Sequence, residues 1–274
     1  MSRYEKLFEK LKDKNEGAFV PFAVLGHPTL EDSEKILDTY IESGADALEV
    51  GIPFSDPGAD GPVIMTADRR ALNNGANTPR CFEIVRKIRA KHPDTPIGML
   101  MYINLVYRPG IENFFRMAAE AGVDSVLIAD VPVEMFESDG LPWAKAAEEN
   151  GIDLIFIAPP NASDDEVRKI ARYSKGYIYL VSRTGVTGAG QEAGHPVARV
   201  VNMLKEMKAP PAMLGFGISQ PEHVREAIKH GAAGAITGSA LVKIIEENLD
   251  DKEKMLSLLR EKVSSLKAAT RSQA

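Results

Sequence analysis

The chain has 274 residues, 44% of them hydrophobic and 26% charged, which is the composition of an ordinary globular protein with enough length for one substantial core. Its formal net charge is -6, whereas proteins that bind nucleic acid or an anionic membrane are usually basic. A small-molecule substrate or a protein partner is therefore favoured. Cys81, the only cysteine, excludes intramolecular disulfides and thiolate metal cages, and without a signal peptide or a long apolar run the expected compartment is the cytoplasm.

The opening segment, residues 1–17, is charged and amphipathic. Tyr4, Leu7, Phe8 and Leu11 recur at helical spacing, which predicts a helix that packs against the rest of the domain. Short apolar runs follow, and eight of them predict strands: Phe19 to Leu25, Asp46 to Val50, Pro96 to Tyr102, Asp124 to Ala129, Asp153 to Ala158, Tyr177 to Val181, Ala212 to Phe216 and Gly234 to Thr237.

Longer helical patterns separate these runs: Leu30 to Glu42, Pro79 to Lys91, Ile111 to Glu120, Trp143 to Glu149, Asp164 to Tyr173, Pro196 to Met207, Pro221 to Lys229, Ala240 to Glu247 and Lys252 to Ala269. Alternating strands and helices imply parallel pairing, and strands that are apolar throughout imply burial on both faces. The sequence therefore predicts an α/β fold, a single (β/α)8 TIM barrel over residues 1–274 with an extra N-terminal helix.

Glycines at the ends of four predicted helices precede strands: Gly44, Gly122, Gly151 and Gly231. Such turns mark the face of a barrel where residues serve stability, so we expect function in the loops at the opposite ends of the strands.

The strand around Glu49 runs into a loop rich in glycine and proline that carries Asp60. A carboxyl group at the end of a buried strand is costly to ionise, so its pKa rises towards values useful for proton transfer near neutrality. Asp60, on a loop, is expected to stay wetter. Two carboxylates in unlike environments can take different acid and base roles, and Glu49 and Asp60 are therefore the candidate catalytic pair.

Three glycine-rich segments follow later strands. The loop over residues 182–195 holds four glycines between Gly185 and Gly194, which fits a mobile lid over the active site or merely a flexible connector. The turns at 215–219 and 237–239 follow the last two strands, where backbone N–H groups at a helix N-terminus commonly bind phosphate in this fold. Ser239 adds a hydroxyl there, or serves as an N-cap, or both.

The chain resembles the α subunit of tryptophan synthase nearly end to end. The resemblance rests on Gly-Ala-Phe-Val-Pro-Phe (17–22), Ala-Asp-Ala-Leu-Glu (45–49), Pro-Phe-Ser-Asp-Pro-Gly-Ala-Asp-Gly-Pro (53–62), Gly-Val-Thr-Gly (185–188), Gly-Phe-Gly-Ile-Ser (215–219) and Gly-Ala-Ile-Thr-Gly-Ser (234–239). It implies a lyase of tryptophan biosynthesis that cleaves indole-3-glycerol phosphate, by a retro-aldol route, to indole and glyceraldehyde 3-phosphate.

The resemblance also implies roles for residues. Glu49 would be the general acid/base and Asp60 the partner of the indole nitrogen; no metal or cofactor is implied for this chain. The phosphate would be held by Gly188, Gly217, Gly238 and Ser239, and the indole pocket would be formed by Phe22, Leu100, Leu127, Ala129, Ile157, Tyr179, Thr187 and Phe216. Taken singly, the apolar members of this set could equally be barrel core.

The family works with a β subunit that binds pyridoxal phosphate, so the resemblance implies a heterotetramer of two α and two β subunits. The loops at 53–60, 102–105 and 130–133 are unusually apolar, as a docking face would be, although they could also pack down on the barrel rim. The segment 135–142 is about four residues longer than is usual in the family.

Three positions depart from the family pattern. Gly58 replaces a leucine on the loop of Asp60, Met65 replaces a glutamine, and His27 replaces an aspartate and is expected to make a local structural contact. A loop that loses a leucine forfeits about 1.5–3 kcal/mol of apolar contact with a partner. Two other functions stay open: a stand-alone lyase that releases indole, and a weakly active barrel that only activates a partner.

Overall fold

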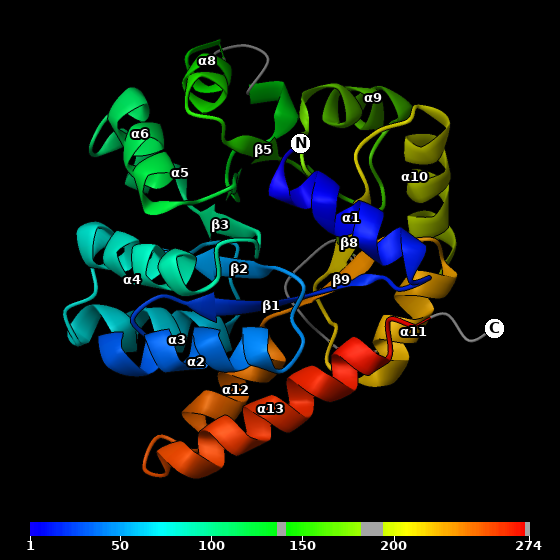
Figure 1. Ribbon diagram of the computed structural model, residues 1–274. Coiled ribbons are helices and arrows are strands. Elements are labelled where there is room, and N and C mark those ends of the chain that lie inside the picture. Colours follow the sequence, from blue (N-terminus) through cyan, green and yellow to red (C-terminus); the bar gives the residue numbers. More distant parts are fainter. Residues whose placement is uncertain (136–140, 182–193, 272–274) are drawn as a thin grey trace.

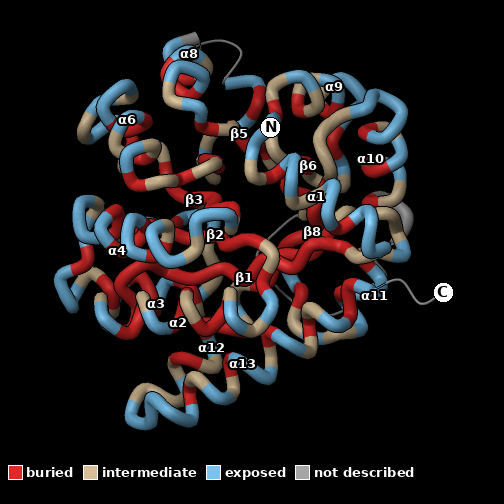
Figure 2. Tube along the Cα trace, in the orientation of Figure 1, coloured by how far each residue is buried: buried red, intermediate tan, exposed pale blue. Residues whose placement is uncertain are grey.

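The computed structural model describes residues 1–135, 141–181 and 194–271, and in these residues helices surround a sheet of parallel strands (Figure 1). The strands are β1 (Ala18–Val24), β2 (Leu48–Gly51), β3 (Ile97–Met101), β4 (Ser125–Ile128), β5 (Asp153–Ile155), β6 (Ile157–Ala158), β7 (Ile178–Val181), β8 (Ala212–Gly215) and β9 (Gly234–Thr237). They are the most continuously buried part of the chain, as Figure 2 shows.

The helices of the described residues follow the strands in alternation. They are α1 (Arg3–Asp13), α2 (Leu30–Glu42), α3 (Pro62–Asn73), α4 (Thr78–Lys91), α5 (Ile103–Tyr107), α6 (Ile111–Ala121), α8 (Leu141–Glu149), α9 (Asp164–Tyr173), α10 (Gly194–Glu206), α11 (Pro221–Lys229), α12 (Ser239–Glu246) and α13 (Lys252–Ala268). The sequence analysis missed α3 and α5, and it wrongly treated residues 103–105 as loop.

The strand order is β5-β4-β3-β2-β1-β9-β8-β7-β6. The two strands at the ends of this order are consecutive in the chain, because the predicted fifth strand is divided at Phe156 into β5 and β6. That single residue joins the ends of the sheet, which gives a nearly closed barrel. The predicted TIM barrel is thus confirmed, with one strand in two pieces.

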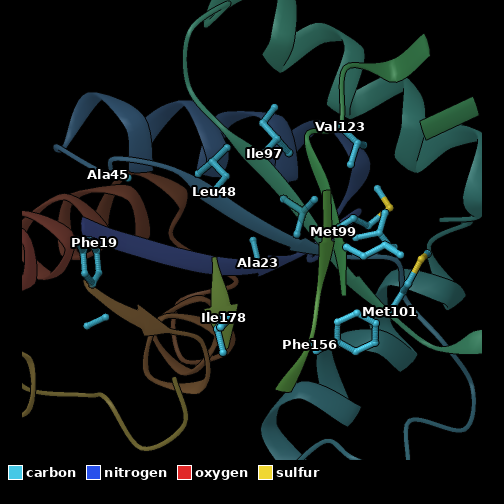
Figure 3. Close-up of a cluster of buried hydrophobic side chains, with 14 of the residues drawn as sticks. Phe19, Ala23, Ala45, Leu48, Ile97, Met99, Met101, Val123, Phe156 and Ile178 are labelled. Carbon is cyan, nitrogen blue, oxygen red and sulfur yellow. The ribbon is translucent and has the colours of Figure 1, made fainter. Parts of the chain in front are cut away.

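Side chains alternate along each strand between two buried environments. Phe19, Leu48, Ile97 and Met99 belong to the large cluster between strands and helices, part of which Figure 3 shows. The intervening residues, among them Val20, Ala47, Leu127, Tyr179 and Ile236, form a separate cluster inside the barrel. Two-sided burial explains why the strands are apolar throughout rather than alternating.

Helix α1 closes the barrel at the end where the strands begin. Its Tyr4 and Leu11 are buried in the interior cluster, and its capping box at Ser2 and Glu5 fixes its first turn. The four glycines predicted as helix-ending turns have left-handed φ angles between 65° and 102°, so that prediction is confirmed. Among the described residues, none of the helices has the length and apolar content needed to cross a membrane.

Candidate active site

A cavity of about 560 Å³ opens where the strands end, which is the face expected to carry function. Its volume suits a small organic ligand. Both carboxylates of the predicted pair line it, Glu49 from β2 and Asp60 from the loop before α3. The other predicted residues that line it are Phe22, Leu100, Ile157, Tyr179, Phe216, Gly217, Gly238 and Ser239.

Glu49 is 2% exposed and lies on the inner side of β2, in register with Phe22 on β1 and Gly98 on β3. Its Oε1 accepts a hydrogen bond of 3.1 Å from the hydroxyl of Tyr177. Burial raises the pKa of Glu49 to about 8, and the charge of Asp60 adds to the rise while the bond from Tyr177 opposes it. Glu49 therefore holds its proton at neutral pH.

A polar cluster inside the barrel supports this glutamate. The ring of Tyr177 lies 5.4 Å from that of Tyr4, whose hydroxyl is 2.9 Å from Oγ of Ser125. Gly98 leaves room for the cluster, since a Cβ there would lie 2.9 Å from the Tyr4 hydroxyl and 2.8 Å from Ser125 Oγ. Helix α1 thus reaches the candidate site through Tyr4, which is more than the packing role predicted for it.

Asp60 lies in a wetter environment than Glu49. Its Oδ2 accepts a hydrogen bond of 2.7 Å from the hydroxyl of Tyr102, and that hydroxyl accepts one of 3.0 Å from the backbone N–H of Ala59. Burial raises the pKa of Asp60, and the bond from Tyr102 opposes the rise. Because Asp60 is partly hydrated and receives this bond, it ionises before Glu49, whose pKa its charge then raises.

Two turns after β8 and β9 form another part of the cavity wall. Gly217, with φ of 80°, follows β8, and Gly238 and Ser239 lie at the start of α12. No side chain caps this helix, so its first N–H groups are open to a ligand. None of the described residues that line the cavity is lysine, arginine or histidine. An anion here would be held by backbone N–H groups, a hydroxyl and the helix dipole.

Aromatic and aliphatic side chains lie between the carboxylates and these turns. The rings of Tyr179 and Phe216 meet edge to face with centroids 6.1 Å apart. A Cβ at Gly215 would lie 2.1 Å from the Tyr179 hydroxyl, so a glycine is needed there. Leu127 and Ala129 are not among the lining residues; Leu127 is buried in the interior cluster and Ala129 packs against it.

Some predicted residues cannot be placed, and others were missed. Gly188 and Thr187, like most of the predicted 182–195 lid, lie outside the described residues. The sequence analysis missed Tyr102 and Tyr177 as partners of the carboxylates, although Tyr177 shares the inward alternation of Tyr179. It also missed the lining residues Ala59, Gly61, Ile64, Pro159, Val181, Ile218, Ser219, Ile236 and Ala240.

The three departures lie around the site. His27 is buried, and its Nε2 lies 2.7 Å from Oε1 of Glu246. Glu246 also receives two hydrogen bonds from Arg70, so His27 makes a local structural contact, as expected. Gly58 is exposed and no atom lies within 4 Å of a Cβ built there, so a longer side chain would project outward. Met65 is 40% exposed.

The apolar loops predicted as a docking face pack largely onto the rim. Val133 is buried, and Ile103, Leu105 and Val131 pack against the core. In the described parts of the segments after β2, β3 and β4, the exposed large hydrophobic side chains are Met65, Tyr107 and Met135. Among the described residues, no group of three or more His, Cys, Asp or Glu could hold a metal ion.

Comparison with known proteins identifies the family. The model of the tryptophan synthase alpha chain family matches residues 8–271. The tryptophan synthase alpha chain of Photobacterium profundum is 56% identical over 271 residues, which cover 99% of both chains. The chain belongs to the tryptophan synthase alpha chain family. An Escherichia coli alpha chain is also similar, 55% identical over 99% of this chain and 100% of that one.

Solved structures of the family share the fold. The alpha chain from Legionella pneumophila has a TM-score of 0.86 at 29% identity and covers 98% of this chain and 97% of its own. The tryptophan synthase of Mycobacterium tuberculosis has a TM-score of 0.87 at 29% identity, with 99% of both chains covered. Tryptophan synthase alpha chains catalyse indole-3-glycerol phosphate cleavage, so the expected family, fold and lyase activity are confirmed.

If the turns at Gly217 and Gly238 hold the phosphate of the substrate, substitutions at Ser239 should have a graded effect on binding. Ser239→Ala keeps the backbone N–H groups and removes one hydroxyl, so binding of glycerol 3-phosphate should weaken by about 2–10-fold. Ser239→Asp adds a like charge at the phosphate, which should cost several kcal/mol, or more than about 100-fold. Isothermal titration calorimetry measures both. Ser264→Asp, which adds the same charge at an exposed position of α13, is the control and should bind normally; equal binding by all variants would contradict this phosphate site.

Proposed function

We propose that the chain cleaves indole-3-glycerol phosphate with Glu49 as the general acid/base and Asp60 as the partner of the indole nitrogen. The observation that carries this assignment is the contrast between the two carboxyl groups at one apolar cavity, one protonated and one that ionises first. The uncapped N-terminus of α12, which lines the same cavity, supports a site for the phosphate end of the substrate.

Cleavage of the substrate requires protonation of the ring. Neutral Glu49 donates its proton to indole C3, which turns the ring into a cation with the positive charge centred on its nitrogen. The Asp60 carboxylate accepts a hydrogen bond from that N–H and stabilises the charge as it develops. Each such group contributes about 10²–10⁴-fold to a rate.

The carbon–carbon bond breaks in the second step. Glu49, now a carboxylate, takes the proton of the hydroxyl on the side-chain carbon bonded to C3. The carbon–oxygen bond becomes a carbonyl, the C3–carbon bond breaks, and its electrons neutralise the ring. Indole and glyceraldehyde 3-phosphate leave, and Glu49 again holds one proton. Proton transfer to or from Glu49 drives both steps, so we propose no cofactor for this chain.

The apolar wall and the anion site position the substrate for these steps. Phe22, Leu100, Ile157, Tyr179 and Phe216 supply surface for the indole ring, and Gly217, Gly238 and Ser239 supply donors for the phosphate. Holding both ends leaves C3 facing Glu49 and the nitrogen facing Asp60, which lowers the entropic part of the barrier. Gly188 and Thr187 remain predictions for the same phosphate and pocket.

We further propose a β-subunit partner in a heterotetramer of two α and two β subunits, with pyridoxal phosphate held by the β subunit. Similarity to the tryptophan synthase of Mycobacterium tuberculosis supports this proposal, as do the exposed Met65, Tyr107 and Met135 beyond β2, β3 and β4. The proposed compartment is the cytoplasm, in keeping with a single, buried cysteine.

Glu49→Gln tests the acid/base role, because glutamine keeps the shape of the side chain and cannot transfer the proton. Indole release from indole-3-glycerol phosphate should fall by about 10²–10⁴-fold. The control Glu120→Gln, on the exposed surface of α6, should leave the rate unchanged. A Glu49→Gln rate within about threefold of the native rate would remove the assigned role.

Addition of the β subunit tests the partner. We expect indole release to accelerate by about 5–150-fold, the usual range of coupling between sites. Gly58→Leu should tighten binding of the β subunit, because the side chain projects outward and adds about 1.5–3 kcal/mol of apolar contact, whereas Gly58→Ala should change it little. A fast native rate that the β subunit does not alter would instead favour a stand-alone lyase, and no cleavage with the partner present would favour a barrel that only activates it.

A further inference from the structure

Asp68 is a buried carboxyl group that the proposed reaction does not use. It lies on α3, is 5% exposed, and stands beside the fully buried Ala67 on the face of the helix turned to the barrel. Among the described residues no cation pairs with it, and an unpaired buried carboxyl group is costly, so its position calls for a physical reason.

Contacts connect Asp68 to Asp60 through the loop over residues 53–61. The backbone N–H of Phe54 faces the Asp68 carboxyl group closely enough to lower its pKa. The Phe54 ring stacks on that of Tyr102, with centroids 5.4 Å apart and planes 26° apart. The hydroxyl of Tyr102 then donates to Asp60. Asp68 is thus anchored at the beginning of the loop, and Asp60 at its end.

Charge connects the same groups. Burial raises the pKa of Asp68 to about 8, the charge of Asp60 adds to the rise, and the backbone N–H of Phe54 opposes it. Burial is the main cause that raises the pKa of Tyr102, and the charge of Asp68 adds to that rise. The neighbouring Arg70 does not neutralise the pair, because its guanidinium binds Glu246. Asp60 and Asp68 therefore cannot both ionise easily.

We propose that Asp68 is a positioning residue for the cleavage reaction: it anchors the loop over residues 53–61 through Phe54 while it stays neutral, so that Asp60 is the charged carboxylate at the indole nitrogen. The inference rests on the proposed function for its catalytic consequence, and on burial and contacts alone for the state of Asp68. When Asp68 loses its proton at alkaline pH, a second negative charge repels Asp60 from its position.

Three variants separate the anchor from the charge. Asp68→Asn keeps an oxygen for the N–H of Phe54 and never ionises, and Asp68→Ala removes both the oxygen and the charge. Asp153→Asn is the matched control, because Asp153 is a partly buried carboxyl whose burial raises its pKa to about 6, at the start of β5 and away from the loop.

The first measurement uses no substrate. Between the pKa of an unfolded aspartate, about 3.9, and that of native Asp68, the folded protein holds a proton that the unfolded chain has lost, so the native protein loses stability as pH rises. The Tm of Asp68→Asn minus that of the native protein should therefore grow from pH 5 until about pH 8. The same difference for Asp153→Asn should stop growing near pH 6. A difference for Asp68→Asn that is constant from pH 5 to 9 would overturn the neutral state of Asp68.

The second measurement follows indole release. Asp68→Asn should retain at pH 9 a several-fold larger share of its neutral-pH kcat than the native protein does, and Asp153→Asn should keep the native profile. Asp68→Ala should lower kcat by about tenfold or more while binding of glycerol 3-phosphate, at the turns after β8 and β9, is unchanged. Identical pH profiles for native and Asp68→Asn, or equal kcat values for the Asn and Ala variants, would overturn the positioning role. A native protein that fails to cleave the substrate would refute the proposed function and leave the Tm result to decide the state of Asp68.

Discussion

A carboxyl group surrounded by apolar side chains keeps its proton far above its ordinary pKa, and in this barrel that group is Glu49. Glu49 lies on the inner side of β2, where it lines the cavity and yet is only 2% exposed. The hydroxyl of Tyr177 partly compensates the burial. The proposed reaction begins when this neutral acid protonates the substrate. The wetter carboxylate and the anion site without cationic side chains then act on the same substrate.

The division of labour between the two carboxylates follows from their supports. Glu49 belongs to a strand fixed by neighbours on both sides, whereas Asp60 belongs to a loop held by Tyr102 and, through Phe54, by Asp68. A rigid strand suits Glu49, which must donate its proton to one carbon atom. A loop allows Asp60 to adjust its position as the charge on the ring nitrogen changes. Exposed Gly58 in this loop adds freedom on the side open to a partner.

The sequence was sufficient for the barrel and for the positions of both carboxylates, because strand periodicity, glycine turns and an acid at the end of an apolar run are local signals. The contacts that tune these groups are not local. Tyr177 and Glu49 are 128 residues apart and meet only once the barrel closes. Helix α3 was missed because Pro62 extends a run of glycine and proline that predicts loop, although proline is favoured in a first helical turn. Its Asp68 therefore could not be connected to Asp60 beforehand.

The central claim is that the barrel keeps Glu49 protonated at neutral pH, ready to donate. Carbon-13 NMR of protein labelled at the glutamate carboxyl carbons tests it most directly, with the Glu49 resonance assigned by its loss in Glu49→Gln. We expect a titration midpoint near pH 8 for this resonance. A midpoint near 4.3, the ordinary value for glutamate, would contradict it.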